Sequence, residues 1–222
     1  MSKKTVMITG ANRGIGLALT QQFCARGDQV IAVCRRASSN LHETDADIID
    51  SINLTREADL LKLQEQLADK NIDILINNAG LLHDGQLGNV DAGMVRAQFE
   101  VNALAPLNVT EFLLDNLDDG SKLVFITSRM GSMTDNGSGG YYGYRMSKAA
   151  LNAAAVSLSH DLADRGIAVG LFHPGFVQTD MVGGNGDISA SEAAERLLKR
   201  IDELNRDNSG QFLHSNGEQL PW

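Results

Sequence analysis

The chain contains three tyrosines, and all of them lie within four positions, at Tyr141, Tyr142 and Tyr144. A phenol can protonate a carbonyl oxygen, but its ordinary pKa is near about 10, so catalysis at neutral pH needs a nearby cation that stabilises the phenolate. Residues four apart on a helix lie on one face. Lys148 has this spacing from Tyr144 and Arg145 has it from Tyr141, whereas the residue four after Tyr142 is uncharged. Spacing alone therefore leaves two candidate acids.

The helix expected around these residues favours Tyr144 over Tyr141. Lys148 precedes an apolar stretch, AALNAAAVSL, whose face is expected to pack on a sheet beside a bound cofactor. Arg145 is expected on a different face, directed to solvent or to a partner chain. We therefore predict Tyr144 as the proton donor and place Tyr141 and Tyr142 in the wall of the substrate pocket, with aromatic packing as the alternative.

The elements that position these residues follow from alternating apolar and amphipathic segments. Short apolar runs without polar alternation predict buried strands at residues 5–9, 29–34, 73–76, 122–127 and 167–172, and weaker strand patterns lie at 47–53 and 211–215. Helical patterns separate them, including a leucine stripe at 60–67 and a capping-box pattern at Ser189 and Glu192. The order predicts one α/β domain over residues 1–222, a Rossmann-like doubly wound parallel sheet of about seven strands with helices on both faces.

Composition excludes several classes of function. The net charge of −9 disfavours binding to nucleic acid or to an anionic membrane, and no apolar run approaches the roughly 18 residues of a membrane span. The two cysteines and five histidines show no metal-ligand spacing, so no metal site is predicted. We expect reduced thiols and a cytoplasmic protein.

A glycine-rich turn follows the first predicted strand. In TGANRGIG, Gly10, Gly14 and Gly16 stand between that strand and a helix. Glycines at this place let the backbone turn sharply and let a pyrophosphate approach the N–H groups of the helix N-terminus. A tight turn without a ligand has the same pattern, but the position after strand one favours a dinucleotide.

The end of the second strand indicates which dinucleotide. An NAD site usually has a carboxylate there for the ribose hydroxyls. This chain has Arg35 and Arg36 instead, no acid before Glu43, and a further guanidinium at Arg13 in the glycine turn. Guanidinium groups suit a 2′-phosphate, which a carboxylate would repel. The cofactor predicted from these residues is NADP(H).

Six motifs in order resemble the short-chain dehydrogenase/reductase family of the classical type. They are TGANRGIG, NNAG (77–80), VNALAP (101–106), ITS (126–128), YRMSK (144–148) and HPGFVQTD (173–180), and the resemblance covers nearly the whole chain. The sequence around YRMSK most resembles that of the C-factor-like, carbonyl-reductase-like branch of the family. The family's fold is the doubly wound sheet expected above.

The resemblance also implies a role for each matching residue. Tyr144 resembles the acid/base, Lys148 the residue that lowers its pKa and holds the nicotinamide ribose, Ser128 the hydroxyl that binds the substrate oxygen, and Asn102 the residue that holds a water in a proton relay. The residues matched to cofactor contacts are Gly10, Asn12, Arg13, Gly14, Ile15, Gly16, Arg35, Arg36, Asn53, Leu54, Asn78, Ala79, Gly80, Tyr144, Lys148, Pro174, Gly175, Val177 and Thr179. A helix-capping serine and a structural amide are the simpler readings of Ser128 and Asn102.

Three features depart from the usual family pattern. Asn53 stands where an aspartate often meets the adenine amino group, and an amide oxygen can still accept that hydrogen bond. The segment after Arg36 is short, which implies a trimmed second helix. The gap between Ser128 and Tyr144 is long, and its residues MTDNGSGG are expected to form a mobile loop beside the site. The short glycine-rich segment after Thr179 would form a small lid or leave the cleft open.

The leading functional hypothesis is an NADPH-dependent reductase that converts a small aldehyde or ketone to an alcohol. A 3-oxoacyl-thioester reductase is the second hypothesis, although an acidic carrier protein would need a basic docking patch that the sequence does not advertise. A dinucleotide-binding regulator with little turnover is the third, and the intact set of Asn102, Ser128, Tyr144 and Lys148 argues against it. The resemblance implies a homodimer or homotetramer.

Overall fold

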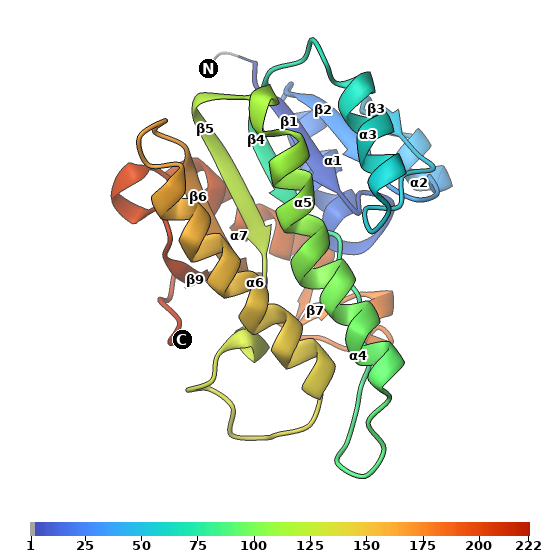
Figure 1. The fold of residues 1–222 in the computed structure, drawn as a ribbon. Helices are drawn as coiled ribbons and strands as arrows, with labels where there is room; N and C mark the ends of the chain where they lie inside the picture. The colour runs from blue at the N-terminus through green and yellow to red at the C-terminus, as the bar shows by residue number, and fades with distance from the viewer. Residues whose placement is uncertain (1–2) are drawn as a thin grey trace.

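Seven strands form one sheet in the computed structural model, which describes residues 3–222 (Figure 1). The strand order is β3-β2-β1-β4-β5-β6-β9, and every neighbouring pair is parallel. The strands are β1 (Thr5–Thr9), β2 (Gln29–Val33), β3 (Asp47–Ile49), β4 (Ile72–Asn77), β5 (Leu117–Ile126), β6 (Ala168–His173) and β9 (Phe212–His214). The chain winds outward in opposite directions from β1 and β4, so the crevice of a doubly wound sheet lies at their carboxyl ends. The predicted fold class is confirmed.

Alternating side chains of the buried strands feed two apolar cores, one on each face of the sheet. Met7 belongs to the core that α3 (Glu57–Gln66), α5 (Ala105–Phe112) and α6 (Tyr142–Asp161) cover. Its neighbours Val6 and Ile8 belong to the core that α1 (Gly14–Ala25) and α7 (Ala190–Glu203) cover. Figure 1 shows α3, α5 and α6 in front of the sheet and α1 and α7 behind it. Both faces are buried, which explains why the strands lack polar alternation.

Two further helices and a small second sheet complete the fold. Helix α4 (Ala92–Phe99) continues through a π-helical turn, Glu100–Leu104, into α5, and Figure 1 shows them as one long column. The helix α2 (Ser39–His42) has only four residues, as the short segment after Arg36 predicted. Strands β7 (Val177–Gln178) and β8 (Ile188–Ser189) pair with each other in the segment that follows β6.

Three local predictions differ from the structure. Strand β3 ends at Ile49, well before residue 53, and β5 begins at Leu117, five residues before the predicted start at 122. The capping box at Ser189 is half formed: Ser189 Oγ accepts from the Glu192 N–H at 3.1 Å, but the Glu192 carboxylate pairs with Arg196 at 2.5 Å. A local i,i+4 ion pair therefore competes successfully with the return contact to the cap.

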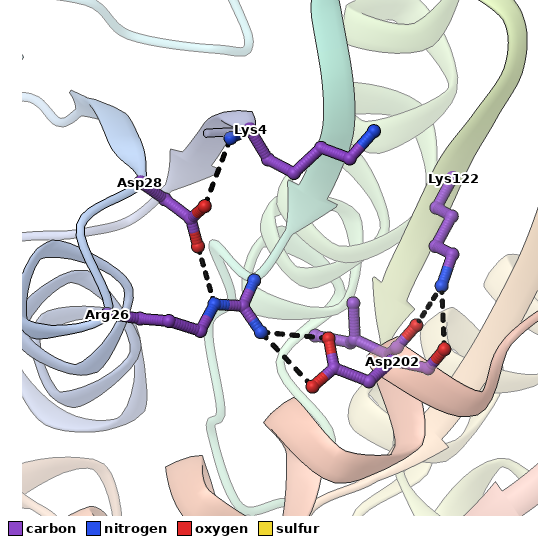
Figure 2. Close-up of polar contacts among 6 residues, drawn as sticks. Lys4, Arg26, Asp28, Lys122 and Asp202 are labelled. Carbon is purple, nitrogen blue, oxygen red and sulfur yellow. Dashed lines mark hydrogen bonds and ion pairs between the residues drawn. The ribbon is translucent and has the colours of Figure 1, made fainter. Parts of the chain in front are cut away.

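Polar side chains join the layers at the amino ends of the strands, the end of the sheet opposite the crevice (Figure 2). Arg26 donates to Asp28 at 2.6 Å and to Asp202 at 2.8 Å, which connects the end of α1 to the end of α7. Lys122 in β5 donates to the carbonyl oxygens of Ile201 and Asp202 at 2.6 and 2.9 Å, so a strand residue caps the C-terminus of α7. The network holds α7 against the sheet, although ion pairs near the surface contribute only about 0–1 kcal/mol each.

None of the helices within residues 3–222 is long and apolar enough to cross a membrane. The same residues contain no cluster of three or more His, Cys, Asp or Glu side chains suited to hold a metal ion.

Candidate active site

A cleft of about 2030 Å³ crosses the carboxyl ends of β1, β2, β4, β5 and β6. Its lining includes nearly all of the residues that the sequence assigned to a site, brought together from segments far apart in the chain. Three assigned residues do not line it: Gly16, Asn102 and Tyr142. Gly16 and Asn102 are buried directly behind the lining, whereas Tyr142 lies on another surface.

The glycine turn is closed by close backbone packing. A Cβ at Gly16 would lie 2.3 Å from the Gly10 carbonyl oxygen, so any side chain there would force the turn open. Gly14 has a φ of +54° and faces Thr179, whose Cγ2 would lie 3.3 Å from a Cβ at Gly14. The segment after β6 therefore rests on the glycine turn. The side chain of Asn78 supports the same turn by donating to the Thr9 carbonyl oxygen at 3.0 Å.

The N-terminus of α1 opens into the cleft without a capping side chain. Arg13 occupies the N-cap position with no side-chain hydrogen bond to the helix, and no acidic residue lies in the first turn. Uncapped N–H groups and the helix dipole together form an anion-binding site. This arrangement fits a pyrophosphate, and the tight packing of Gly10 and Gly16 keeps the approach to these N–H groups clear of side chains.

Three guanidinium groups lie at the end of the cleft beside β2. Arg35 and Arg36 are exposed, and neither has a carboxylate within 4.0 Å among residues 3–222. Arg13 pairs with Asp180 at 3.3 Å, and both side chains are largely exposed. Two unpaired guanidinium groups in a chain of net charge −9 fit a phosphate monoester. These residues therefore suit the 2′-phosphate of NADP(H).

Asn53 lies at the same end of the cleft, but its side-chain oxygen already accepts hydrogen bonds within the protein. Its Oδ1 accepts from the Thr55 N–H at 3.2 Å and from the Thr55 hydroxyl at 3.0 Å. An adenine amino group would have to share this oxygen. The predicted contact between Asn53 and adenine stays a prediction.

Tyr144, Lys148 and Ser128 meet at the bottom of the cleft, and each is less than 10% exposed: 8%, 4% and 6% respectively. Tyr144 and Lys148 are one turn apart on α6, and Lys148 Nζ lies 5.8 Å from the centroid of the Tyr144 ring. Lys148 Nζ donates to the Ile126 carbonyl oxygen at 2.9 Å, near the end of β5. Ser128 follows that strand, and its Oγ accepts from the Met130 N–H at 3.1 Å. Ser128 thus caps a short 3-10 turn and also faces the cleft.

Burial dominates the electrostatics of this group. It raises the pKa of Tyr144 to about 12, with the hydrogen bond to Ser128 opposing the shift, and it lowers the pKa of Lys148 to about 8. Burial is therefore the largest influence on the phenol in this structure, and the expected lowering of the Tyr144 pKa by Lys148 stays a prediction. A protonated phenol at neutral pH suits a proton donor.

Asn102 lies in the π-helical turn Glu100–Leu104 and is fully buried. Its Nδ2 donates to the Leu81 carbonyl oxygen at 2.7 Å and to Ser147 Oγ at 2.9 Å, and its Oδ1 accepts from the Leu81 N–H at 2.7 Å. Ser147 Oγ in turn donates to the Tyr144 carbonyl oxygen at 2.8 Å. The side chain thus connects the segment after β4 to α6, and both of its amide hydrogens are used. The proton relay through Asn102 stays a prediction.

The first turn of α6 presents residues 141, 144, 145 and 148 to the cleft. Tyr141 lines the cleft as predicted. Tyr142 is 37% exposed and lines a small apolar pocket with Leu87 and Met146, so its predicted place in the substrate pocket is not supported. Arg145 was expected on another face, but it lines the cleft and donates to Gly140 O and Ser138 Oγ. The helix phase explains both corrections, because 141, 145 and 148 share a face that 142 does not.

One contact that sequence reasoning missed fixes the distance between β5 and α6. Thr127 Oγ1 donates to Asn152 Oδ1 at 2.6 Å, and both residues are buried. Thr127 precedes Ser128 in the chain, and Asn152 lies one turn after Lys148 on α6. An asparagine inside the alanine-rich stretch was the available signal, because a buried amide needs a partner.

His173 at the end of β6 also lines the cleft, and its imidazole is held neutral. Burial lowers its pKa to about 3, with further repulsion from His214, Arg129 and Lys148. The ring packs edge-on against His214 with centroids 4.9 Å apart. A neutral, buried imidazole does not serve as a proton donor near neutral pH, so His173 is not a second candidate acid.

The lowered pKa of His173 predicts a loss of stability in acid. Between about pH 6.5 and pH 3 the unfolded chain binds a proton at this residue and the folded chain does not, so stability falls as the pH falls through this window. Between pH 7 and pH 4.5, we expect the free energy of unfolding of His173→Gln to fall by about 2 kcal/mol less than that of the wild type. Urea unfolding at the two pH values measures the difference, and His160→Gln, at an exposed position on α6, is the control. Equal losses in all three proteins would contradict the prediction.

Comparisons with known proteins agree with this geometry. The family model described as short chain dehydrogenase matches residues 4–203. A protein described as 1-hydroxy-2-glutathionyl-2-methyl-3-butene dehydrogenase, from Rhodococcus sp. (strain AD45), is 36% identical over 98% of this chain and 99% of its own. The C-signal of Myxococcus xanthus is 45% identical over 68% of this chain and 93% of its own.

Solved structures that superpose on this fold include carbonyl reductases. The NADPH-bound carbonyl reductase from chicken fatty liver superposes with a TM-score of 0.90 at 28% identity, and the alignment covers 100% of both chains. Its cofactor is the one that Arg35 and Arg36 suit here. With a family model that spans most of the sequence, and with the glycine turn, Ser128, Tyr144 and Lys148 gathered in one cleft, the chain belongs to the short-chain dehydrogenase/reductase family.

Proposed function

We propose that this protein is an NADPH-dependent reductase that converts an aldehyde or ketone to an alcohol, with Tyr144 as the proton donor. One observation carries the proposal: a single cleft has two unpaired guanidinium groups at one end and the buried set of Tyr144, Lys148 and Ser128 in its interior. A phosphorylated dinucleotide and a carbonyl compound are the ligands that these two groups of residues fit.

The residues that would hold NADP(H) follow from the cleft. The N-terminus of α1 suits the pyrophosphate, Arg35 and Arg36 suit the 2′-phosphate, and Lys148 suits the nicotinamide ribose. The cofactor supplies the hydride of the reaction. The NADPH-bound chicken reductase, whose fold covers this chain completely, supports the choice of cofactor.

The protein's own part in the reaction is to bind the carbonyl oxygen and to protonate it. Ser128 and Tyr144 donate hydrogen bonds to that oxygen, and the Tyr144 proton moves to it as the carbonyl carbon accepts hydride. Because burial holds the pKa of Tyr144 at about 12, the phenol carries its proton throughout the neutral range. The adjacent Lys148 cation then stabilises the phenolate that remains.

The test is NADPH oxidation by the purified protein across a panel of aldehydes, ketones, quinones and 3-oxoacyl thioesters, with NADH in parallel. Turnover that is faster with NADPH supports the proposal and narrows the substrate class. Tight NADPH binding without turnover of any carbonyl would overturn it in favour of a dinucleotide-sensing role.

A second candidate is oxidation of an alcohol that carries a glutathionyl group. Its support is the Rhodococcus relative, which is named for such a substrate and aligns over almost its whole length. This reaction needs the phenolate form of Tyr144, which the raised pKa disfavours. Assays with glutathione-conjugated alcohols and NADP⁺ or NAD⁺ therefore belong in the same panel.

We also propose that the protein forms a homodimer or homotetramer through α4, α5 and α6, in the cytoplasm. An apolar patch near these helices supports the contact: Leu87, Val90, Tyr142 and Met146 are all at least 37% exposed. Two free thiols, Cys24 and Cys34, are compatible with a reducing compartment. Light scattering of the purified protein tests the assembly, and a monomer at all concentrations would contradict it.

A further inference from the structure

The cations that line the cleft separate into those that are neutralised and those that are not. Arg129 pairs with Asp135 at 3.3 Å and with Glu218 at 3.2 Å. The Arg13–Asp180 pair, described above, neutralises another. The remaining arginines and lysine of the lining have no carboxylate within 4.0 Å among residues 3–222: Arg35, Arg36, Arg145 and Lys148. The proposed function gives a role to all of these except Arg145.

Arg145 is anchored only by uncharged groups. Its Nε donates to the Gly140 carbonyl oxygen at 3.2 Å, and its Nη2 donates to Ser138 Oγ at 2.9 Å and to the Gly139 carbonyl oxygen at 3.4 Å. No acceptor for Nη1 is found in the described part of the chain. The guanidinium therefore keeps its full charge and a free edge in the lining of the cleft.

The loop that holds Arg145 is itself constrained. Gly139, Gly140 and Tyr141 have φ values of +65°, +63° and +51°, a run of left-handed backbone that only glycine adopts without strain. The Tyr141 N–H donates to the Gly85 carbonyl oxygen at 2.8 Å, which fastens this loop to the loop after β4. Because strained backbone persists only where its surroundings hold it, the guanidinium is oriented before any ligand arrives.

The phase of α6 puts Arg145 beside the reaction centre. It is adjacent to Tyr144 in sequence, and Tyr141 and Lys148 lie one turn away on either side along the cleft-facing surface. Arg35 and Arg36, which suit the cofactor phosphate, follow β2 at the other side of β1, whereas α6 packs against β6. The free cation of Arg145 thus belongs to the substrate end of the cleft.

We propose that Arg145 binds a carboxylate of the substrate, so that the preferred substrates are aldehydes or ketones that carry a carboxylate group. The inference rests on the proposed reductase function and adds the substrate class. A planar guanidinium with an open edge binds a carboxylate in a defined orientation, which would fix the carbonyl group against Tyr144 and Ser128.

One acidic residue in the lining competes with this role. Asp84 is exposed, lies in the loop after β4 and has no ion pair among residues 3–222. If Asp84 neutralised Arg145 in solution, Asp84→Asn would strengthen binding of a carboxylate. If Arg145 instead serves the substrate directly, Asp84→Asn changes the preference between charged and neutral substrates by less than about threefold.

The experiment compares two matched pairs of substrates that differ in one charge. They are 4-carboxybenzaldehyde with its methyl ester, and succinic semialdehyde with its methyl ester. We expect kcat/KM for at least one acid to exceed that for its ester in the wild type. Arg145→Gln should lower kcat/KM for that acid by about tenfold to a hundredfold, mainly through KM, while the ester changes by less than about threefold. Arg145→Lys should retain part of the preference, and added salt should weaken binding of the acid only.

The control variant is Arg206→Gln, which removes an exposed arginine outside the cleft and should leave all four substrates unchanged. A purely structural role for Arg145 as the anchor of residues 138–140 predicts equal losses for acid and ester. That result, or an acid-to-ester ratio unchanged by Arg145→Gln in both pairs, overturns the proposal.

A binding measurement separates this proposal from the reductase assignment. Calorimetry with 4-(hydroxymethyl)benzoate and with γ-hydroxybutyrate, the alcohols formed from the two acids, needs no turnover. If no aldehyde is reduced but either carboxylate binds the wild type and not Arg145→Gln, the reductase assignment fails and the anion site stands. If aldehydes are reduced while binding of both carboxylates is unchanged by Arg145→Gln, the proposed anion site is wrong and the reductase assignment stands.

Discussion

Replacing Tyr144 by phenylalanine is expected to lower kcat for carbonyl reduction by about a hundredfold to ten-thousandfold, the contribution of a positioned general acid. The substitution removes one hydroxyl from a ring that is only 8% exposed, so the packing of α6 should be kept. NADPH oxidation under saturating substrate measures kcat. Cofactor binding, followed by the quenching of protein fluorescence or by calorimetry, should change by less than about threefold, because the lost group acts on the substrate oxygen.

Tyr141→Phe is the matched control for this prediction. Tyr141 lines the same cleft, lies at the start of the same helix and has Arg145 at the spacing that Lys148 has from Tyr144. Its hydroxyl is expected to contribute less than about fivefold to kcat. A large loss in Tyr141→Phe together with an active Tyr144→Phe would reverse the assignment of the proton donor.

Removing the two guanidinium groups at the end of β2 is expected to change the cofactor preference. In the double variant Arg35→Ala with Arg36→Ala, KM for NADPH should rise about a hundredfold, while KM for NADH should change by less than about threefold. Both side chains are exposed and unpaired within residues 3–222, so their loss leaves no buried charge without a partner and should not affect folding. Kinetics with both cofactors at a fixed aldehyde concentration measure the effect.

Two observations accompany this prediction. In the wild type, KM for NADPH should rise with ionic strength more steeply than KM for NADH, because only NADPH has the 2′-phosphate that Arg35 and Arg36 suit. Arg13→Ala should raise KM for NADPH by less than the double variant does, since Arg13 already pairs with Asp180. An equal loss of both cofactors in the double variant would show that these residues support the cleft rather than bind the phosphate.

The parts of the fold that the sequence determined are those encoded by local pattern. Five apolar runs without alternation mark strands buried on both faces, and with two weaker strand patterns they give the seven-stranded parallel sheet that is observed. The glycine turn was also readable, because Gly16 has no room for a Cβ and Gly14 needs a positive φ. The four-residue α2 followed from the short segment after Arg36. In each case the requirement lies in neighbouring residues, so the sequence carries it.

The tertiary structure decided what each polar side chain of the site contacts. The spacing of Lys148 from Tyr144 predicted that the lysine cation lowers the pKa of the phenol. In the structure, burial is the largest influence and raises this pKa to about 12. The side-chain amide of Asn102 connects Leu81 to Ser147, a contact that the sequence did not indicate, and its predicted part in a proton relay is untested. These outcomes depend on desolvation and on partners that are distant in sequence, and no local pattern reports either quantity.

Helix phase and loop shape were likewise settled only in three dimensions. The sequence placed Tyr142 in the pocket and Arg145 outside it, because the pattern did not identify the first residue of α6. The left-handed backbone of Gly139, Gly140 and Tyr141 sets that start, and it turns Arg145 into the cleft and Tyr142 away from it. The sequence by itself thus determined the family, the fold and the catalytic residue types. The tertiary structure decided which charges remain free to meet a ligand, because pairing between charges depends on contacts between distant parts of the chain.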